Sequence, residues 1–232
     1  MSFPRRQAYS DLVNAFTLYL EKHCGRIKVC PTEHEWFRPV GQADGAPLWE
    51  FELYMHLPEW KVRRKTVYIV VHAKETLQKP TNDEPIVVRS TVTLSYYNLE
   101  SDSQLLHSIH YDFGAPQVRH PLFHAQVTGE PPEVPDRVQR ELEIYLPMQP
   151  AKAFKFARIP TANMSLPSTL LCIATDHCED DDAIAEFRKA LEKVRKVIRY
   201  PHVGELIEKV AGASPQAICS GAWYLIEGRS KE

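Results

Sequence analysis

The densest group of chemically capable side chains lies between residues 107 and 124, in the stretch HSIHYDFGAPQVRHPLFH. It holds four of the chain's ten histidines and one aspartate. Imidazole titrates near neutral pH and is a frequent metal ligand, and several imidazoles beside a carboxylate suit Zn²⁺ or a similar divalent cation. The stretch therefore indicates a metal-binding or catalytic site, or else a strand and turn that use histidine structurally.

Strand alternation divides these side chains between two faces. If residues 104–113 form a strand, His107 lies on the same face as Leu105 and Ile109, which is the apolar side. His110 and Asp112 then point to the opposite face. We therefore interpret His107 as structural and His110 with Asp112 as candidates for chemistry.

The following segment, HPLFHAQ, brings two more imidazoles together. In a strand His120 and His124 lie on one face, and in a helix they are neighbours at i, i+4. If the intervening turn folds this segment back beside the strand, both histidines converge on His110 and Asp112. That convergence is a geometric prediction.

A convergent site would have assignable roles. His110, His120 and His124 would be the metal ligands, and the metal would lower the pKa of a bound water to make a hydrolytic nucleophile. The catalytic set would be His110 as base, Asp112 as its orienting carboxylate and Arg158 as the clamp for a phosphate or carboxylate. The structural alternatives stay open: half-exposed histidines are common on strands, Asp112 can shape a turn, and Arg158 can anchor a loop.

A sheet has to position these residues. Four runs at 48–57, 66–73, 86–97 and 104–113 alternate with a period of two and are rich in β-branched and aromatic residues. No helical pattern separates them, so they predict an antiparallel meander of four strands or more. The segment from Cys30 to Pro47 is rich in proline and glycine and is interpreted as a loop.

Helical periodicity flanks the sheet. A first helix is expected after Ser10, and the C-terminal third predicts helices at 166–178, 183–199 and 203–210 and a last strand at 217–228. The basic residues of 183–199 suit a solvated helix face, with a phosphate-binding stripe as the alternative. The predicted fold is one α+β domain over 1–232 with an N-terminal helix, the meander sheet and a C-terminal helical layer. It is sheet-rich over 1–127, has a proline-rich loop at 128–137 and is helix-rich over 138–232.

Composition narrows the function classes. The formal net charge is −2, so nucleic-acid binding would need a local basic patch. No apolar run reaches the length of about 20 residues that spans a bilayer, which predicts no membrane partner. The dinucleotide, P-loop, G-x-S-x-G and H-E-x-x-H motifs are absent, which disfavours a dinucleotide cofactor. Five cysteines without C-x-x-C spacing suit reduced thiols in the cytoplasm.

The segments HYDFG, HPLFHAQ and RIPTANMSLPSTLLCIATDH, in that order, resemble a group of uncharacterised bacterial proteins. In that group a His/Tyr-Asp strand precedes an H-P-x-x-H element and a basic-Ile-Pro segment that leads into a helix. The resemblance covers roughly a third of the chain and implies a bacterial, cytoplasmic protein without implying an activity. Position by position it points to His110, Asp112, His120, His124 and Arg158.

Two functions are therefore expected. The first is a soluble intracellular binding or accessory module that engages a protein or nucleic-acid partner through the histidine-bearing sheet face or the basic helix. The alternative is a metal-dependent hydrolase, of the phosphodiesterase or nuclease kind, built on the histidine cluster at 110–124. The absent catalytic motifs favour the first, and the clustering of histidines favours the second.

Overall fold

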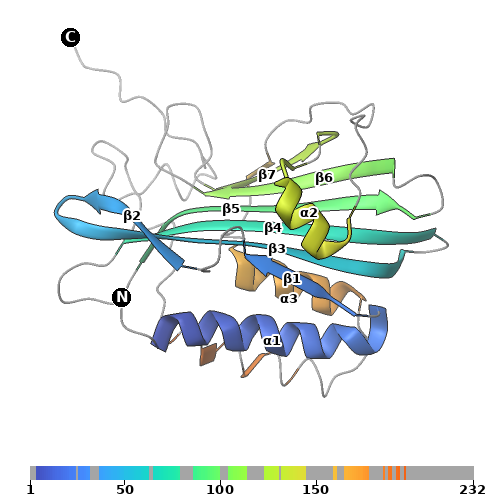
Figure 1. The fold of residues 1–232 in the computed structure, drawn as a ribbon, viewed down its shortest axis with the longest axis horizontal. Helices are drawn as coiled ribbons and strands as arrows, with labels where there is room; N and C mark the ends of the chain where they lie inside the picture. Colours follow the sequence, from blue (N-terminus) through green and yellow to red (C-terminus); the bar gives the residue numbers. More distant parts are fainter. Residues whose placement is uncertain are drawn as a thin grey trace, which may run out of the picture.

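The chain folds around one large antiparallel sheet with helices on both faces (Figure 1). The computed structural model describes residues 4–24, 26–31, 37–62, 65–78, 86–99, 104–113, 123–130, 132–144, 159–160 and 165–177, together with residues 185, 188, 189, 192, 193 and 196. This arrangement is the predicted α+β class.

Eight strands form the described sheet, in the order β1-β3-β4-β5-β6-β7-β8, and β2 also pairs with β3. Every pairing is antiparallel. The four predicted runs form the central meander, which confirms that part of the prediction. The strands are β1 (Lys28–Pro31), β2 (Phe37–Ala43), β3 (Ala46–Val62), β4 (Lys65–Gln78), β5 (Ile86–Asn98), β6 (Gln104–Phe113), β7 (Phe123–Thr128) and β8 (Ile159–Pro160).

The prediction of a loop over Cys30–Pro47 is wrong for much of its length. The last two residues of β1 and the whole of β2 lie within this segment. A two-residue turn at Asp44 and Gly45, with φ values of 52° and 75°, joins β2 to β3. Positive φ at both central positions is the geometry that lets a tight hairpin follow the twist of its strands, and Asp-Gly favours it. Gly41, with φ 139°, lies at the register shift in β2.

Two helices pack against the same face of the sheet (Figure 1). Helix α1 (Pro4–Cys24) and helix α3 (Leu166–His177) contact each other as well as the sheet. The predicted N-terminal helix is confirmed, but it begins at Pro4, so Ser10 lies inside it. The main core on this face is formed by alternate strand residues and by Tyr9, Leu12, Val13, Phe16, Leu20, Leu166, Leu170 and Ile173 from the two helices.

A fully buried carboxylate fixes α3 within this core. Glu75 of β4 accepts hydrogen bonds from the Tyr9 hydroxyl, from Ser90 Oγ at 3.2 Å and from the backbone N–H of Leu166 at 3.0 Å. The N–H groups of a first helical turn need acceptors outside the helix. Glu75 therefore joins both helices to the sheet.

The other face carries a second, smaller core under helix α2 (Asp136–Leu142). This helix begins inside the segment predicted as a proline-rich loop at 128–137. Leu105 belongs to this core and not to the face of His107, because a register shift opposite Tyr96 and Tyr97 reverses the alternation near the start of β6. The members of the second core are Cys30, Tyr54, Tyr68, Val70, Tyr97, Leu105, Val134, Val138, Leu142 and Ile144.

The predicted helix at 183–199 is described only in part. Its described residues are helical and exposed: Ala185, Arg188, Lys189, Glu192, Lys193 and Lys196. The helix expected at 203–210 and the strand expected at 217–228 lie outside the described residues. Within the described part of the chain, none of the helices has the length and apolar character of a membrane-spanning helix.

Candidate functional site

Strands β6 and β7 bring three of the predicted site residues to one face of the sheet. Asp112 lies opposite His124, and His110 lies opposite Gln126, in the antiparallel register of these strands. Side chains of directly paired residues point to the same face. His124 Nε2 lies 3.6 Å from Asp112 Oδ2. That separation is longer than an ordinary hydrogen bond, so the contact is electrostatic.

The two partners of this contact differ in exposure. The side chain of His124 is 3% exposed, whereas that of Asp112 is 35% exposed. An incoming ligand would therefore meet the Asp112 carboxylate directly and would not reach the imidazole. This burial disfavours His124 as a catalytic base or as an open metal ligand in this conformation.

His110 is half-buried and contacts β5. Its Nδ1 lies 3.2 Å from Thr93 Oγ1, the residue opposite it in the register. Burial lowers the pKa of His110, and the neighbouring His72 lowers it further, while Asp112 and Glu130 act in the opposite direction. His110 is therefore neutral at pH 7 and offers one donor and one acceptor.

His120 and Arg158 lie outside the described residues, so the structure tests neither the three-histidine set nor the proposed phosphate clamp. Among the residues that it describes, no three His, Cys, Asp or Glu side chains are grouped so as to hold a metal ion. His110, Asp112 and His124 share a face, but they do not by themselves form a metal-binding set.

The fourth histidine of the opening stretch lies on the opposite face, as predicted. His107 is half-buried and stacks on Tyr96, with ring centroids 4.7 Å apart and planes 21° apart. Tyr96 in turn packs against the main core. Burial lowers the pKa of His107. This contact supports a structural role for His107.

Sequence reasoning missed a second polar group on the same face, in β3 and β4. His72 Nε2 donates to Glu52 Oε1 at 2.9 Å, and the His72 ring stacks on Tyr54 at 4.2 Å with the planes 6° apart. Lys74 Nζ lies 3.3 Å from Glu50 Oε2 and 3.5 Å from Glu52 Oε2.

Arg38 of β2 extends this ion-pair network. Its guanidinium pairs with Glu50 and lies 3.9 Å from Glu52 Oε2. Burial alone would raise the pKa of Glu52, but the hydrogen bonds and positive charges of His72 and Lys74 outweigh burial and lower it. Glu52 is therefore a stable carboxylate, surrounded by cationic and imidazole groups from two neighbouring strands.

The register joins the two groups into one surface. Thr93 lies between His72 and His110, and Thr91 lies between Lys74 and Asp112. We call this surface the polar face. It consists of Arg38, Glu50, Glu52, His72, Lys74, Thr91, Thr93, His110, Asp112, His124 and Gln126. In the sequence, each strand has polar residues at alternate positions, and this pattern could have indicated a polar face. The sequence alone did not provide the register that aligns these residues across the strands.

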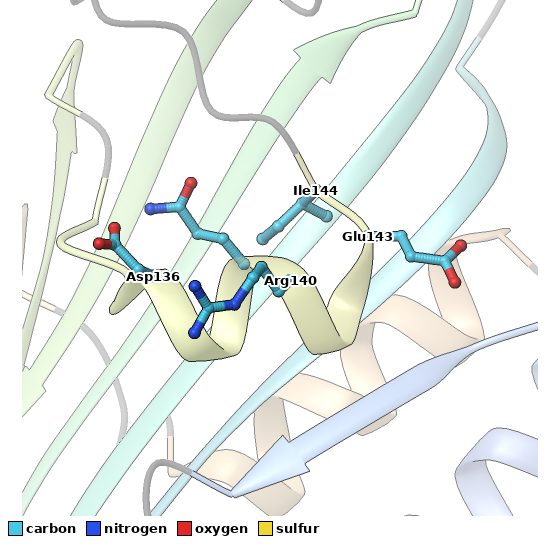
Figure 2. Close-up of a pocket in the computed structure, with 5 residues that line it drawn as sticks. Asp136, Arg140, Glu143 and Ile144 are labelled. Carbon is cyan, nitrogen blue, oxygen red and sulfur yellow. The ribbon is translucent and has the colours of Figure 1, made fainter.

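A surface pocket lies beside α2 (Figure 2). Its volume is about 340 Å³, and its described lining residues are Asp136, Gln139, Arg140, Glu143 and Ile144. Opposite charges line it, and Glu143 also pairs with Lys28 of β1. None of these lining residues belongs to the polar face.

Cys30, below α2, has an unreactive thiol. It is buried and its Sγ lies 2.9 Å from Glu141 Oε2. Burial, and then the hydrogen bond and negative charge of Glu141, raise the pKa of Cys30 to about 12. The thiolate is the nucleophile and metal ligand, so this protonated cysteine is structural.

Comparisons with known proteins give no relative to guide the interpretation. No protein-family model matches the chain, and neither the search of curated proteins nor the search of solved structures found a match.

Proposed function

We propose that this chain is a binding module that holds a protein partner against the polar face. The observation that carries the proposal is the alignment of titratable and hydroxyl side chains across β3 to β7, several of which are partly exposed. Lys74 is 41% exposed, Asp112 is 35% exposed and Arg38 is 34% exposed. Such a surface offers donors, acceptors and both signs of charge to a complementary surface.

The pairing of these groups favours recognition over catalysis. His72, Lys74 and Arg38 are held by the carboxylates of Glu50 and Glu52. Fixed, mutually paired charges give an interface its register and its partner selectivity. A general base instead needs an accessible lone pair near the reacting proton.

The charge of the polar face favours a protein over a nucleic acid. Three carboxylates, on Glu50, Glu52 and Asp112, accompany two permanent cations, on Arg38 and Lys74. A phosphate backbone is recognised by an excess of positive charge. The mixture on this face suits a polar protein surface that presents both donors and acceptors.

Site-specific photocrosslinking in cells tests this proposal. A benzophenone side chain at Thr91 or at Gln126 places the crosslinker on the polar face, and Leu18 of α1, which is 68% exposed on another surface, is the control. We expect one heterologous adduct of defined mass from both polar-face positions and none from position 18. The identified protein should then bind the purified chain. No adduct at either polar-face position, or the same adduct at all three, contradicts the proposal.

A metal-dependent hydrolase is the second candidate, because His110, Asp112 and His124 share this face. In this proposal His120 completes the ligand set and Arg158 holds the phosphate. Elemental analysis of the purified protein beside His120→Ala/His124→Ala, with His107→Ala as the opposite-face control, tests it. Stoichiometric metal that the double variant alone loses supports this function. Absence of metal from the wild-type protein loaded with Zn²⁺ contradicts it.

We also infer a cytoplasmic location, which the five cysteines without C-x-x-C spacing support. The protonated thiol of Cys30, enclosed under α2, agrees with a reduced state. Alkylation of intact cells with a thiol reagent that crosses membranes, and with one that does not, tests the location. Labelling of the denatured chain only after the permeant reagent supports it; labelling by the impermeant reagent contradicts it.

A further inference from the structure

The described residues between positions 185 and 196 carry a second group of charged side chains. The described residues of the segment after Asp182 are all helical and exposed, and their spacing of three, one, three, one and three places them on one side of a helix. They are Ala185, Arg188, Lys189, Glu192, Lys193 and Lys196. We call this surface the basic stripe.

The basic stripe concentrates positive charge. Four cations accompany one carboxylate, Glu192, on a chain whose formal net charge is −2. At 1.5 Å per residue the cations from Arg188 to Lys196 span about 12 Å along the helix. Double-stranded DNA carries about one negative charge per 1.7 Å of its axis, so several phosphates lie within reach of a stripe of this length.

We propose that the basic stripe binds the phosphate backbone of nucleic acid, as a second surface that does not depend on the proposed role of the polar face. Charge complementarity carries the proposal. The described part of the stripe has no aromatic or large aliphatic side chain. A membrane-surface helix uses such side chains to insert into the bilayer. Four exposed cations beside one carboxylate match a ligand that is recognised mainly by its negative charge.

Fluorescence anisotropy with a labelled 20-base-pair DNA duplex and a labelled 20-nucleotide RNA tests this inference. The wild-type chain is compared with Lys193→Gln/Lys196→Gln. The matched control is Arg89→Gln/Arg140→Gln, which removes two exposed cations elsewhere and changes the net charge equally. Circular dichroism confirms that all three proteins are folded.

We expect the stripe variant to weaken duplex binding at 50 mM salt by about tenfold for each lost contact. The slope of log K against log salt should become shallower by about 1.8, because each phosphate contact contributes about 0.9. The control should bind as the wild type does. Equal weakening in both double variants, no binding by the wild type, or tighter binding to phosphatidylserine vesicles than to either nucleic acid would overturn the proposal.

Discussion

The Nε2 atom of His72 lies 2.9 Å from Oε1 of Glu52, and this pair connects β4 to β3 on the polar face. The contact lowers the pKa of Glu52 despite its burial. Three residues away along β4, the carboxylate of Glu75 is buried on the opposite face, beside the main core. Strand alternation thus gives β4 one carboxylate network on each face of the sheet.

The half-buried histidines should make folding sensitive to mild acid. Burial lowers the pKa values of His56, His107 and His110 below their ordinary value of 6.5. The unfolded chain then binds more protons than the folded one just below pH 6.5, so the free energy of unfolding falls as pH falls. Urea denaturation at pH 7.5, 6.5 and 5.5 should show this decrease. In His56→Gln/His107→Gln/His110→Gln the decrease should be smaller; an unchanged pH dependence contradicts the assignment.

Glu52 should add a second, more acidic window. Its folded pKa is lowered from 4.5, so its contribution to stability is present above pH 4.5 and is lost as pH falls through the folded value. In Glu52→Gln the free energy of unfolding should therefore decrease less below pH 4.5 than in the wild type. The decrease between pH 6.5 and pH 5.5 should be the same in both proteins. Equal changes in both windows would show that another group controls the acidic one.

Replacing Glu75 should destabilise the fold more than replacing an exposed glutamate. Glu75→Ala leaves the Tyr9 hydroxyl, Ser90 Oγ and the Leu166 N–H without this acceptor. An unsatisfied buried polar group costs about 1–3 kcal/mol, so we expect a loss of about 3 kcal/mol or more in chemical denaturation. The exposed-strand control, Glu59→Ala, should lose about 0.5 kcal/mol or less. Similar losses in both variants would contradict the role of Glu75.

Cys30 should resist thiol reagents in the folded protein. Because its pKa is raised to about 12, very little thiolate exists at pH 8. The wild-type chain and Cys30→Ser should therefore show the same number of fast-reacting thiols with Ellman's reagent under native conditions. In guanidinium chloride the wild type should show one more reactive thiol than Cys30→Ser. A difference of one thiol in the native proteins would show that Cys30 is accessible and reactive.

Substitutions of Gly45 in the β2–β3 hairpin turn should differ in their effect on stability. Its φ of 75° disfavours a side chain even though no atom lies within 4 Å of a Cβ added there. Gly45→Ala should lower the free energy of unfolding by about 1 kcal/mol from backbone strain. Gly45→Asn should cost less, because asparagine tolerates this conformation. Equal thermal shifts for both variants would argue against a strained turn.

The central strands could be predicted because their apolar and polar residues alternate without interruption. The predicted run at 104–113 has the bounds of β6. The β2–β3 hairpin was missed because proline and glycine between residues 31 and 47 indicated a loop. The Asp44-Gly45 pair, a strong hairpin signal, was available there.

The faces were harder to predict than the strands. A single register shift moves Leu105 into the core under α2, and alternation within one strand cannot reveal it. The polar face needed the same cross-strand information, because Glu52 and His124 are 72 positions apart in sequence. His110, Asp112 and His124 were found because they are close in sequence, whereas His72 and Lys74 required the pairing of β4 with β5.

The affinity of the photocrosslinked protein for the purified chain tests the role of the polar face most directly. Thr91→Arg places a long side chain between Lys74 and Asp112, and Leu18→Arg places the same side chain on the exposed surface of α1. Isothermal titration calorimetry should show Kd raised about tenfold or more by Thr91→Arg and changed less than about twofold by Leu18→Arg. Equal Kd values for the wild type and Thr91→Arg would contradict the account.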